Sequence, residues 1–200
     1  MARPRDPARE AGRRAAILEA AARVFARHGL KGAPIAAICR AAGISPGHLY
    51  YYFPSKESLI EAMAASDLAA IRDYAAQLGT LDELLDAAVI STDPADPRGP
   101  APMLAGPLAF DLLAEAQRNP RVSAILRAHY AEVTRIFGAR LAAAQARGQV
   151  AAAHEPERLA RLVGAVREGL LAMAAIDGGL VDPAMRAQVR AMLDRTARGG

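Results

Sequence analysis

The side chains whose types and spacing could do chemistry are concentrated between residues 45 and 56. They are hydrogen-bonding polar or aromatic groups, and one of them carries a positive charge: Ser45, His48, Tyr51, Tyr52 and Lys56. An imidazole can hydrogen-bond the edge of a DNA base, whereas hydroxyl and ammonium groups suit phosphate oxygens. This set of groups favours contact with a nucleic acid.

Catalytic or metal-dependent chemistry has much less support in the sequence. Cys39 could pair with His28 or His48 as a nucleophile, but it falls on the apolar side of a short predicted helix, where a buried, inert thiol is expected. There is neither a Gly-rich phosphate loop nor a Gly-x-Ser-x-Gly motif. The four histidines are scattered without the spacing of metal ligands: His28, His48, His129 and His154. We therefore expect no enzyme, no cofactor and no metal site.

Positive charge is concentrated at the beginning of the chain. The net charge is +4, but residues 1–56 alone hold ten of the 25 Lys and Arg and three of the 21 Asp and Glu, a net of +7. This asymmetry favours a polyanion as the partner of the N-terminal surface, although a solvated basic tail would give the same count. Residues 1–9 contain two prolines and three arginines without apolar periodicity, so we expect a flexible basic arm over residues 1–12.

Composition and periodicity predict an all-α protein. Hydrophobic residues make up 52% of the 200 residues and aromatic ones only 4%, so the apolar mass is rich in alanine and favours packed helices. About nine helices are expected, at residues 14–28, 34–42, 46–52, 56–78, 80–90, 103–117, 120–147, 155–177 and 183–197, with a proline-rich loop at 91–102. No apolar run approaches the roughly 20 residues of a membrane span, and we expect a cytoplasmic protein.

A turn between two short predicted helices resembles a helix–turn–helix DNA reader. The turn is Ala42-Gly43-Ile44-Ser45, in which Gly43 permits the tight conformation and Ile44 can fill the space between the helices. Helix 14–28 would complete a small core, and Tyr50 is expected to pack into it. An ordinary helical corner has the same spacing, but exposed polar and aromatic groups and nearby cations favour the DNA reader.

Residues 13–60 are similar to the N-terminal domain of TetR-family transcriptional regulators. The positions that carry this resemblance are Ile17, Ala21, Phe25, Gly29, Ile35, Ile38, Ala42, Gly43, Ile44, Ser45, Gly47, Leu49, Tyr50, Phe53, Lys56 and Leu59. The resemblance implies a helix–turn–helix domain over residues 13–56 and an effector-binding and dimerisation domain over 57–200. Ala33 stands where the family often has a capping Thr, which predicts a second helix start less firmly capped by about 1 kcal/mol.

The expected DNA contacts divide by chemistry. Phosphate contacts supply affinity and salt dependence, and base contacts supply sequence preference. The front of the recognition helix would read bases, with phosphates bound by the arm and by hydroxyl and cationic side chains. The full set is Arg14, Arg40, Ser45, Pro46, Gly47, His48, Tyr51, Tyr52 and Lys56.

The rest of the chain is expected to bind a small effector and a second copy of the protein. A mainly hydrophobic effector site is predicted from Met63, Phe110, Leu113, Tyr130, Thr134 and Phe137. In this family the last two helices form an intersubunit four-helix bundle, which implies dimer contacts from Leu159, Leu162, Val166, Leu170, Met173, Val189, Met192 and Leu193. Residues 112–130 resemble the C-terminal part of the choline-responsive BetI-like branch.

Taken with the resemblance, these features predict a repressor that binds a palindromic operator as a homodimer and is released by its effector. The alternative is a helical binding or scaffold protein with a degenerate helix–turn–helix. A gel shift on the DNA that flanks its own gene separates the two, because only the repressor forms a salt-sensitive, sequence-dependent complex.

Overall fold

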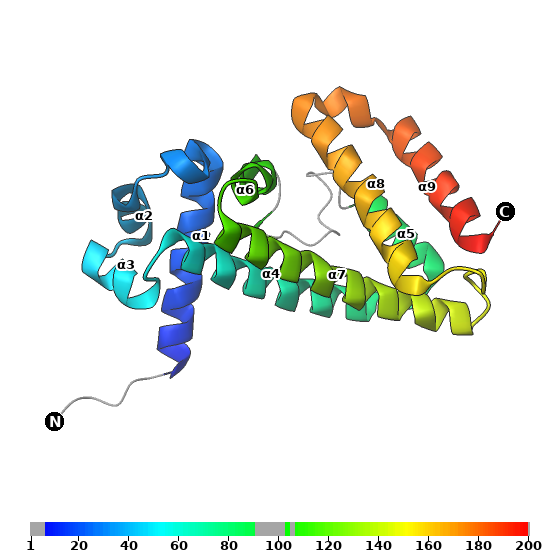
Figure 1. Ribbon diagram of the computed structural model, residues 1–200, viewed down its shortest axis with the longest axis horizontal. Coiled ribbons are helices and arrows are strands. Elements are labelled where there is room, and N and C mark those ends of the chain that lie inside the picture. The colour runs from blue at the N-terminus through cyan, green and yellow to red at the C-terminus, as the bar shows by residue number, and fades with distance from the viewer. Residues whose placement is uncertain (1–6, 91–102, 105–106, 200) are drawn as a thin grey trace. The chain divides into compact units, whose positions relative to one another are not determined.

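The computed structural model describes residues 7–90, 103–104 and 107–199, and within these ranges all regular structure is helical (Figure 1). The helices are α1 (Pro7–Gly32), α2 (Ile35–Ala42), α3 (Pro46–Tyr52), α4 (Lys56–Gln77), α5 (Leu81–Ile90), α6 (Pro107–Ala116), α7 (Pro120–Ala146), α8 (Pro156–Ile176), the short 3₁₀ helix η1 (Gly178–Val181) and α9 (Pro183–Arg198). The predicted all-α class is confirmed. The predicted loop at 91–102 lies outside the described residues. No described helix combines the length and the apolar character needed to cross a membrane.

Local sequence signals explain where most helices begin and end. The Ser45 hydroxyl accepts a hydrogen bond from the His48 amide at 3.3 Å, and the Asp182 carboxylate accepts one from Met185 at 2.7 Å. Gly43 ends α2 in the left-handed conformation, with φ 63°. By contrast α2 begins after Pro34 without a side-chain cap, as expected for a chain with alanine at the preceding position.

Helix α1 begins earlier than predicted, and its backbone leaves the helical conformation at Gly29 (φ 69°), where the predicted helix ended. It begins at Pro7, so the part of the predicted arm from residue 7 to residue 12 is helical. Proline suits the first helical position, and the following Ala8, Arg9 and Glu10 are strong helix formers. None of the described side chains of α1 before Ile17 is buried, so helix propensity rather than packing accounts for this extension.

The chain is divided into two compact units. The first unit consists of Met1–Asp67 and Met103–Arg127, and the second of Leu68–Pro102 and Ala128–Gly200. The first unit is larger than the predicted helix–turn–helix domain, because α6 and the beginning of α7 share its core. The functional division at residue 56 stays a prediction.

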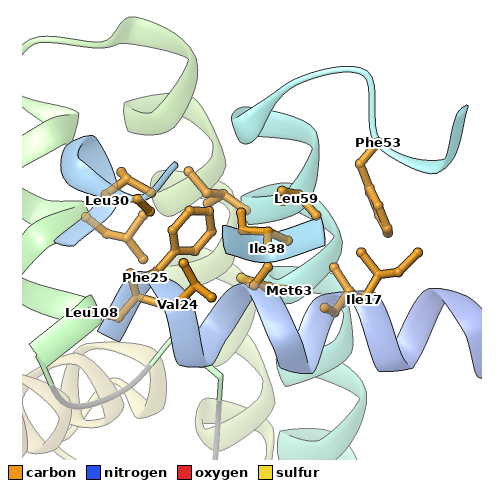
Figure 2. Packing of buried hydrophobic residues seen from close by; sticks show 14 of the residues in the cluster. Ile17, Val24, Phe25, Leu30, Ile38, Phe53, Leu59, Met63 and Leu108 are labelled. Atoms are coloured by element: carbon orange, nitrogen blue, oxygen red, sulfur yellow. The ribbon is translucent and has the colours of Figure 1, made fainter. Parts of the chain in front are cut away.

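The core of the first unit surrounds Phe25, which is completely buried (Figure 2). Side chains from α1 to α4 pack with it, and α6 adds Leu108 and Leu112. Burial of each large apolar side chain stabilises the unit by roughly 1.5–3 kcal/mol. A polar contact fixes α6 further, because the Asp111 carboxylate accepts a hydrogen bond from the Leu30 amide at 3.2 Å.

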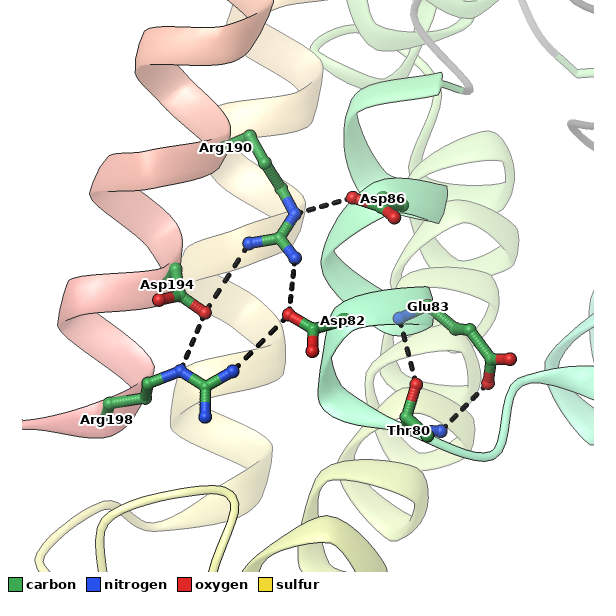
Figure 3. Close-up of polar contacts among 7 residues, drawn as sticks. All are labelled: Thr80, Asp82, Glu83, Asp86, Arg190, Asp194 and Arg198. Carbon is green, nitrogen blue, oxygen red and sulfur yellow. Dashed lines mark hydrogen bonds and ion pairs between the residues drawn. The ribbon is translucent and has the colours of Figure 1, made fainter.

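The second unit joins α5, α7, α8 and α9 around a separate apolar core. Its buried members are Leu81, Leu84, Leu85, Val89, Leu141, Ala144, Val150, Leu159, Ala160, Leu193 and Ala197. On its surface the Arg190 guanidinium of α9 lies 2.6 Å from Asp86 and 2.7 Å from Asp82 of α5 (Figure 3). The Arg190 side chain is partly buried and its acidic partners are exposed, and ion pairs near the surface each contribute about 0–1 kcal/mol, so the apolar core supplies most of the stability.

Gly138 in α7 lies against the beginning of α8. A Cβ atom there would be 2.8 Å from Cγ of Glu157 and 3.2 Å from its Cα. We expect Gly138→Ala to lower the free energy of unfolding by about 1–3 kcal/mol through overpacking, although alanine favours a helix. Gly164 in α8 has no atom within 4 Å of its Cβ position, so Gly164→Ala should raise stability by about 0.5–1 kcal/mol. Urea unfolding measures both, and equal stabilisation would contradict the close contact.

Candidate DNA-binding surface

The helix–turn–helix is built from α2, a three-residue turn and α3. The Ile44 amide donates to the Cys39 carbonyl at 3.0 Å, which closes the turn behind Gly43. The Ile44 side chain packs partly buried against the first-unit core, and Leu49, only 1% exposed, anchors α3 from the same side. The other side of α3 therefore faces solvent.

The residues predicted to read bases lie on this solvent side. Ser45, Pro46, Gly47 and His48 are exposed, and Tyr51 is 56% exposed. The Ser45 hydroxyl already accepts the His48 amide, so it fixes the beginning of α3 while the imidazole stays accessible. The ring nitrogens of His48 can hydrogen-bond a base edge.

The prediction that Tyr50 packs in the core is wrong, since half of its surface is exposed. Leu49 and Phe53 face inward at a spacing of four, and Tyr52 packs partly buried beside them. Successive residues are about 100° apart around a helix, so this register turns Tyr50 outward. The spacing of the apolar residues Leu49 and Phe53 was the sequence signal that could have shown Tyr50 to face outward. Tyr50 therefore joins the candidate DNA contacts.

Two of the predicted phosphate-binding cations hold the unit together. Lys56 donates from Nζ to the carbonyls of Leu30 at 3.1 Å and Lys31 at 3.4 Å, at the end of α1. Arg14 donates to the Tyr52 carbonyl at 3.2 Å, and its guanidinium lies 4.5 Å from the centre of the Phe53 ring. These hydrogen bonds join residues 25 to 38 positions apart, so local sequence patterns do not reveal them.

A shallow concavity lies beside the front of α3. Its lining includes two guanidinium groups, Arg13 and Arg40, together with His48 and the turn, the complete set being Arg13, Ala36, Cys39, Arg40, Gly43, Ile44, Ser45, Pro46 and His48. Arg40 is exposed as predicted, whereas Arg13 was not among the predicted contacts. Cys39 is buried, as expected. The charges of this concavity suit a phosphate group.

The predicted effector-binding residues are divided between the two units. Met63, Phe110 and Leu113 belong to the first, and Tyr130, Thr134 and Phe137 to the second. Met63 is completely buried in the first-unit core, so core packing accounts for it and its part in binding an effector stays a prediction. Burial raises the pKa of Tyr130, and the nearby Glu168 carboxylate adds to this, so its hydroxyl stays protonated and able to donate.

Three of the predicted dimer contacts are almost completely buried within the chain itself, namely Leu159, Leu170 and Leu193. Their part in a dimer stays a prediction. Val166 and Val189 are partly buried against the second-unit core. The predicted residues that do stay exposed are Leu162, Met173 and Met192, and sequence reasoning missed two further exposed ones, Ile176 and Leu180.

A short, exposed helix held by a glycine turn against a small apolar core defines a helix–turn–helix DNA-binding protein. Residues 17–63 match the sequence model of bacterial regulatory proteins of the tetR family, and residues 81–198 match that of the C-terminal part of BetI-type transcriptional repressors. The chain belongs to the TetR family of bacterial transcriptional regulators.

Individual relatives agree with this assignment. The HTH-type transcriptional regulator UidR of Escherichia coli K12 is 31% identical over 163 residues, which is 80% of each chain. The repressor KstR2 of Rhodococcus jostii is 43% identical over 56 residues, or 28% of each chain. The structure of Salmonella enterica GusR superimposes with a TM-score of 0.76 at 30% identity, covering 94% of this chain and 96% of that one. The predicted regulator is confirmed over the scaffold alternative, and its family is one of regulators rather than enzymes.

Proposed function

We propose that the protein represses transcription by binding a palindromic operator as a homodimer, and that a small, mainly hydrophobic effector releases it. The observation that carries this proposal is the exposed front of α3, which presents His48 and Tyr51 while Leu49 anchors the opposite side. The seven residues of α3 extend about 10 Å, which suits a major groove about 12 Å wide.

Chemistry assigns the roles on this surface. His48 offers hydrogen bonds to base edges, and Pro46 and Gly47 offer close apolar and backbone contact. The Tyr50 and Tyr51 hydroxyls, with Arg40, suit the flanking phosphates. No Arg or Gln occupies α3 for a two-bond base contact, so DNA shape contributes to the sequence preference.

Specific recognition of an operator requires a dimer, because one short helix reads only a few base pairs. The exposed apolar residues of α8, η1 and α9 are the candidate interface. In a two-fold dimer the α3 helices would lie about 34–36 Å apart, one turn of DNA, and the operator would share the symmetry of the protein.

Release by an effector requires that it bind the DNA-free state more tightly than the bound one. Helix α6 supports a route for this coupling, because Leu108 and Leu112 belong to the core that holds α1 and α3 in place. A shift of α6 would therefore move the packing behind the recognition helix.

The test is selection of bound duplexes from a random library by the full-length protein. We expect enrichment of a palindrome whose half-site centres are about 10 base pairs apart, and a gel shift that weakens as salt rises. Enrichment of no sequence, with binding no tighter than to random DNA, would overturn the proposed function.

We expect Lys56→Ala to weaken binding to all sequences alike and to lower the slope of log affinity against log salt by about one. The lysine would release the two carbonyls of α1 and meet a phosphate when DNA arrives. His48→Ala is the matched comparison, and should change the preference among operators instead. Anisotropy titrations at several salt concentrations measure the slope. An unchanged slope in Lys56→Ala would leave this lysine with a structural role alone.

A further inference from the structure

We propose that the front of α3 recognises thymine by its C5 methyl group, which would enter an open space over Gly47 in the operator complex. This inference rests on the proposed function and deepens it, because it names a base that the half-sites should contain. The groups that would contact the methyl group are the Pro46 ring, the Cα of Gly47 and the Tyr51 ring.

Gly47 lies at the centre of the outward side of α3. Leu49 is buried and marks the inward side. At about 100° per residue, Gly47 is about 200° from Leu49 and about 40° from Tyr51, so the glycine and the tyrosine share the side that faces solvent. Apart from its chain neighbours and the backbone of its own helix, no atom lies within 4 Å of the position that a Cβ of Gly47 would take. A base edge can therefore approach the helix backbone closely at this point.

The open space over Gly47 is bordered by rings. Pro46 precedes it with an exposed pyrrolidine ring, and proline has no amide hydrogen to donate. Tyr51 follows one turn later, and its ring lies edge-on to the Tyr52 ring, with 5.1 Å between the two centroids. Because Tyr52 packs partly buried against the first-unit core, this contact restricts the position of the Tyr51 ring. The space thus presents a fixed and mainly apolar border to the groove.

Thymine is the base whose major-groove edge matches such a surface. It alone presents a methyl group there, whereas the other three bases present hydrogen-bonding groups. A purely polar edge placed against Pro46 and Gly47 would lose its water without gaining a partner, but burial of a methyl group is favourable. Helix α3 contains no Arg, Lys, Asn or Gln that would favour guanine or adenine instead. The exposed His48 ring remains available for a neighbouring base.

The experiment uses the full-length protein and a duplex that the wild type selects from a random library. Deoxyuridine replaces thymidine at one position at a time, symmetrically in both half-sites, which removes only the C5 methyl group and keeps the base pair. We expect one position at which affinity falls about fourfold for each methyl group, or about 16-fold for the two half-sites together. The same replacement outside the half-sites should leave the affinity unchanged.

Gly47→Ala is the complementary change in the protein, because its Cβ would occupy the space proposed for the methyl group. We expect this variant to bind the thymine duplex more weakly than the wild type does, and to lose the preference for thymine over uracil. Gly164→Ala is the control, since it adds the same methyl group to open space on α8 and should keep that preference. Circular dichroism checks that both variants are folded, and the uracil series on the wild type needs neither of them.

The possible results separate the inference from the proposed function. If the wild type selects an operator whose half-sites contain no thymine, or if no uracil replacement weakens binding, the inference is wrong while the proposed function stands. A folded Gly47→Ala variant that keeps the full preference for thymine would also overturn the inference. If the wild type selects no operator, both are wrong.

Discussion

Replacing Leu162 and Ile176 together by glutamate should convert the proposed homodimer to a monomer and abolish tight operator binding. Both side chains are exposed, Ile176 by 82% and Leu162 by 47%, and the spacing places them with Met173 on one face of α8. A soluble chain rarely leaves such a stripe uncovered. In a two-fold interface each substitution occurs twice, and a desolvated, unpaired carboxylate is strongly unfavourable.

We expect the dimer dissociation constant to rise at least about 100-fold, and operator affinity to fall about 10²- to 10⁴-fold because the two half-sites are no longer linked. Sedimentation equilibrium measures the first and anisotropy the second. Leu113→Glu is the control, as an exposed leucine on α6 that should leave the dimer intact. A double variant that is still dimeric at low micromolar concentration would exclude this face as the interface.

The second large effect is expected at Asp67, the buried carboxylate of α4. It is 2% exposed, and its two oxygens accept hydrogen bonds from the amides of Met103 at 2.8 Å and Leu104 at 2.9 Å. Hydrogen bonds to a charged group are worth about 1.5–3 kcal/mol, and a buried donor left without an acceptor costs about 1–3 kcal/mol. In Asp67→Asn the new amide group would face one of these donors.

We expect Asp67→Asn to lower the free energy of unfolding by about 2–4 kcal/mol, and the melting temperature by roughly 2–4 °C for each kcal/mol in a chain of this size. Asp73→Asn is the matched control on the same helix, because Asp73 is exposed and its replacement should change stability by less than about 0.5 kcal/mol. Calorimetry and urea unfolding measure both variants. Equal stability of the two would show that Asp67 does not anchor residues 103–104.

The sequence was informative wherever structure depends on neighbouring residues. Ser45, Pro46 and Gly43 determine the turn and the beginning of α3 through local hydrogen bonds and backbone preference, so the helix–turn–helix was predictable. The exposure of Tyr50 could also have been predicted, because the inward positions Leu49 and Phe53 define the register of α3.

Contacts between segments that are distant in the sequence could not be predicted from it. Nothing in the periodicity of α6 indicates that Leu108 packs with Phe25 and Ile38, since an apolar stripe does not identify what covers it. The same holds for α8, where Leu159 and Leu162 are both apolar, yet one lies inside the chain and the other outside. For that reason the helix–turn–helix could be placed from the sequence, whereas the apolar residues of α8 that are buried within the chain could not be told from the exposed ones.

The composition of the first unit bears on how chimeric regulators should be made from this chain. A graft cut at residue 56 would leave behind Leu59, Met63, Leu108 and Leu112, all of which are buried beside Phe25. The transplanted segment would then depend on foreign side chains to fill its interior. Exchanging residues 1–67 together with 103–127 would instead carry all the buried members of this core across together.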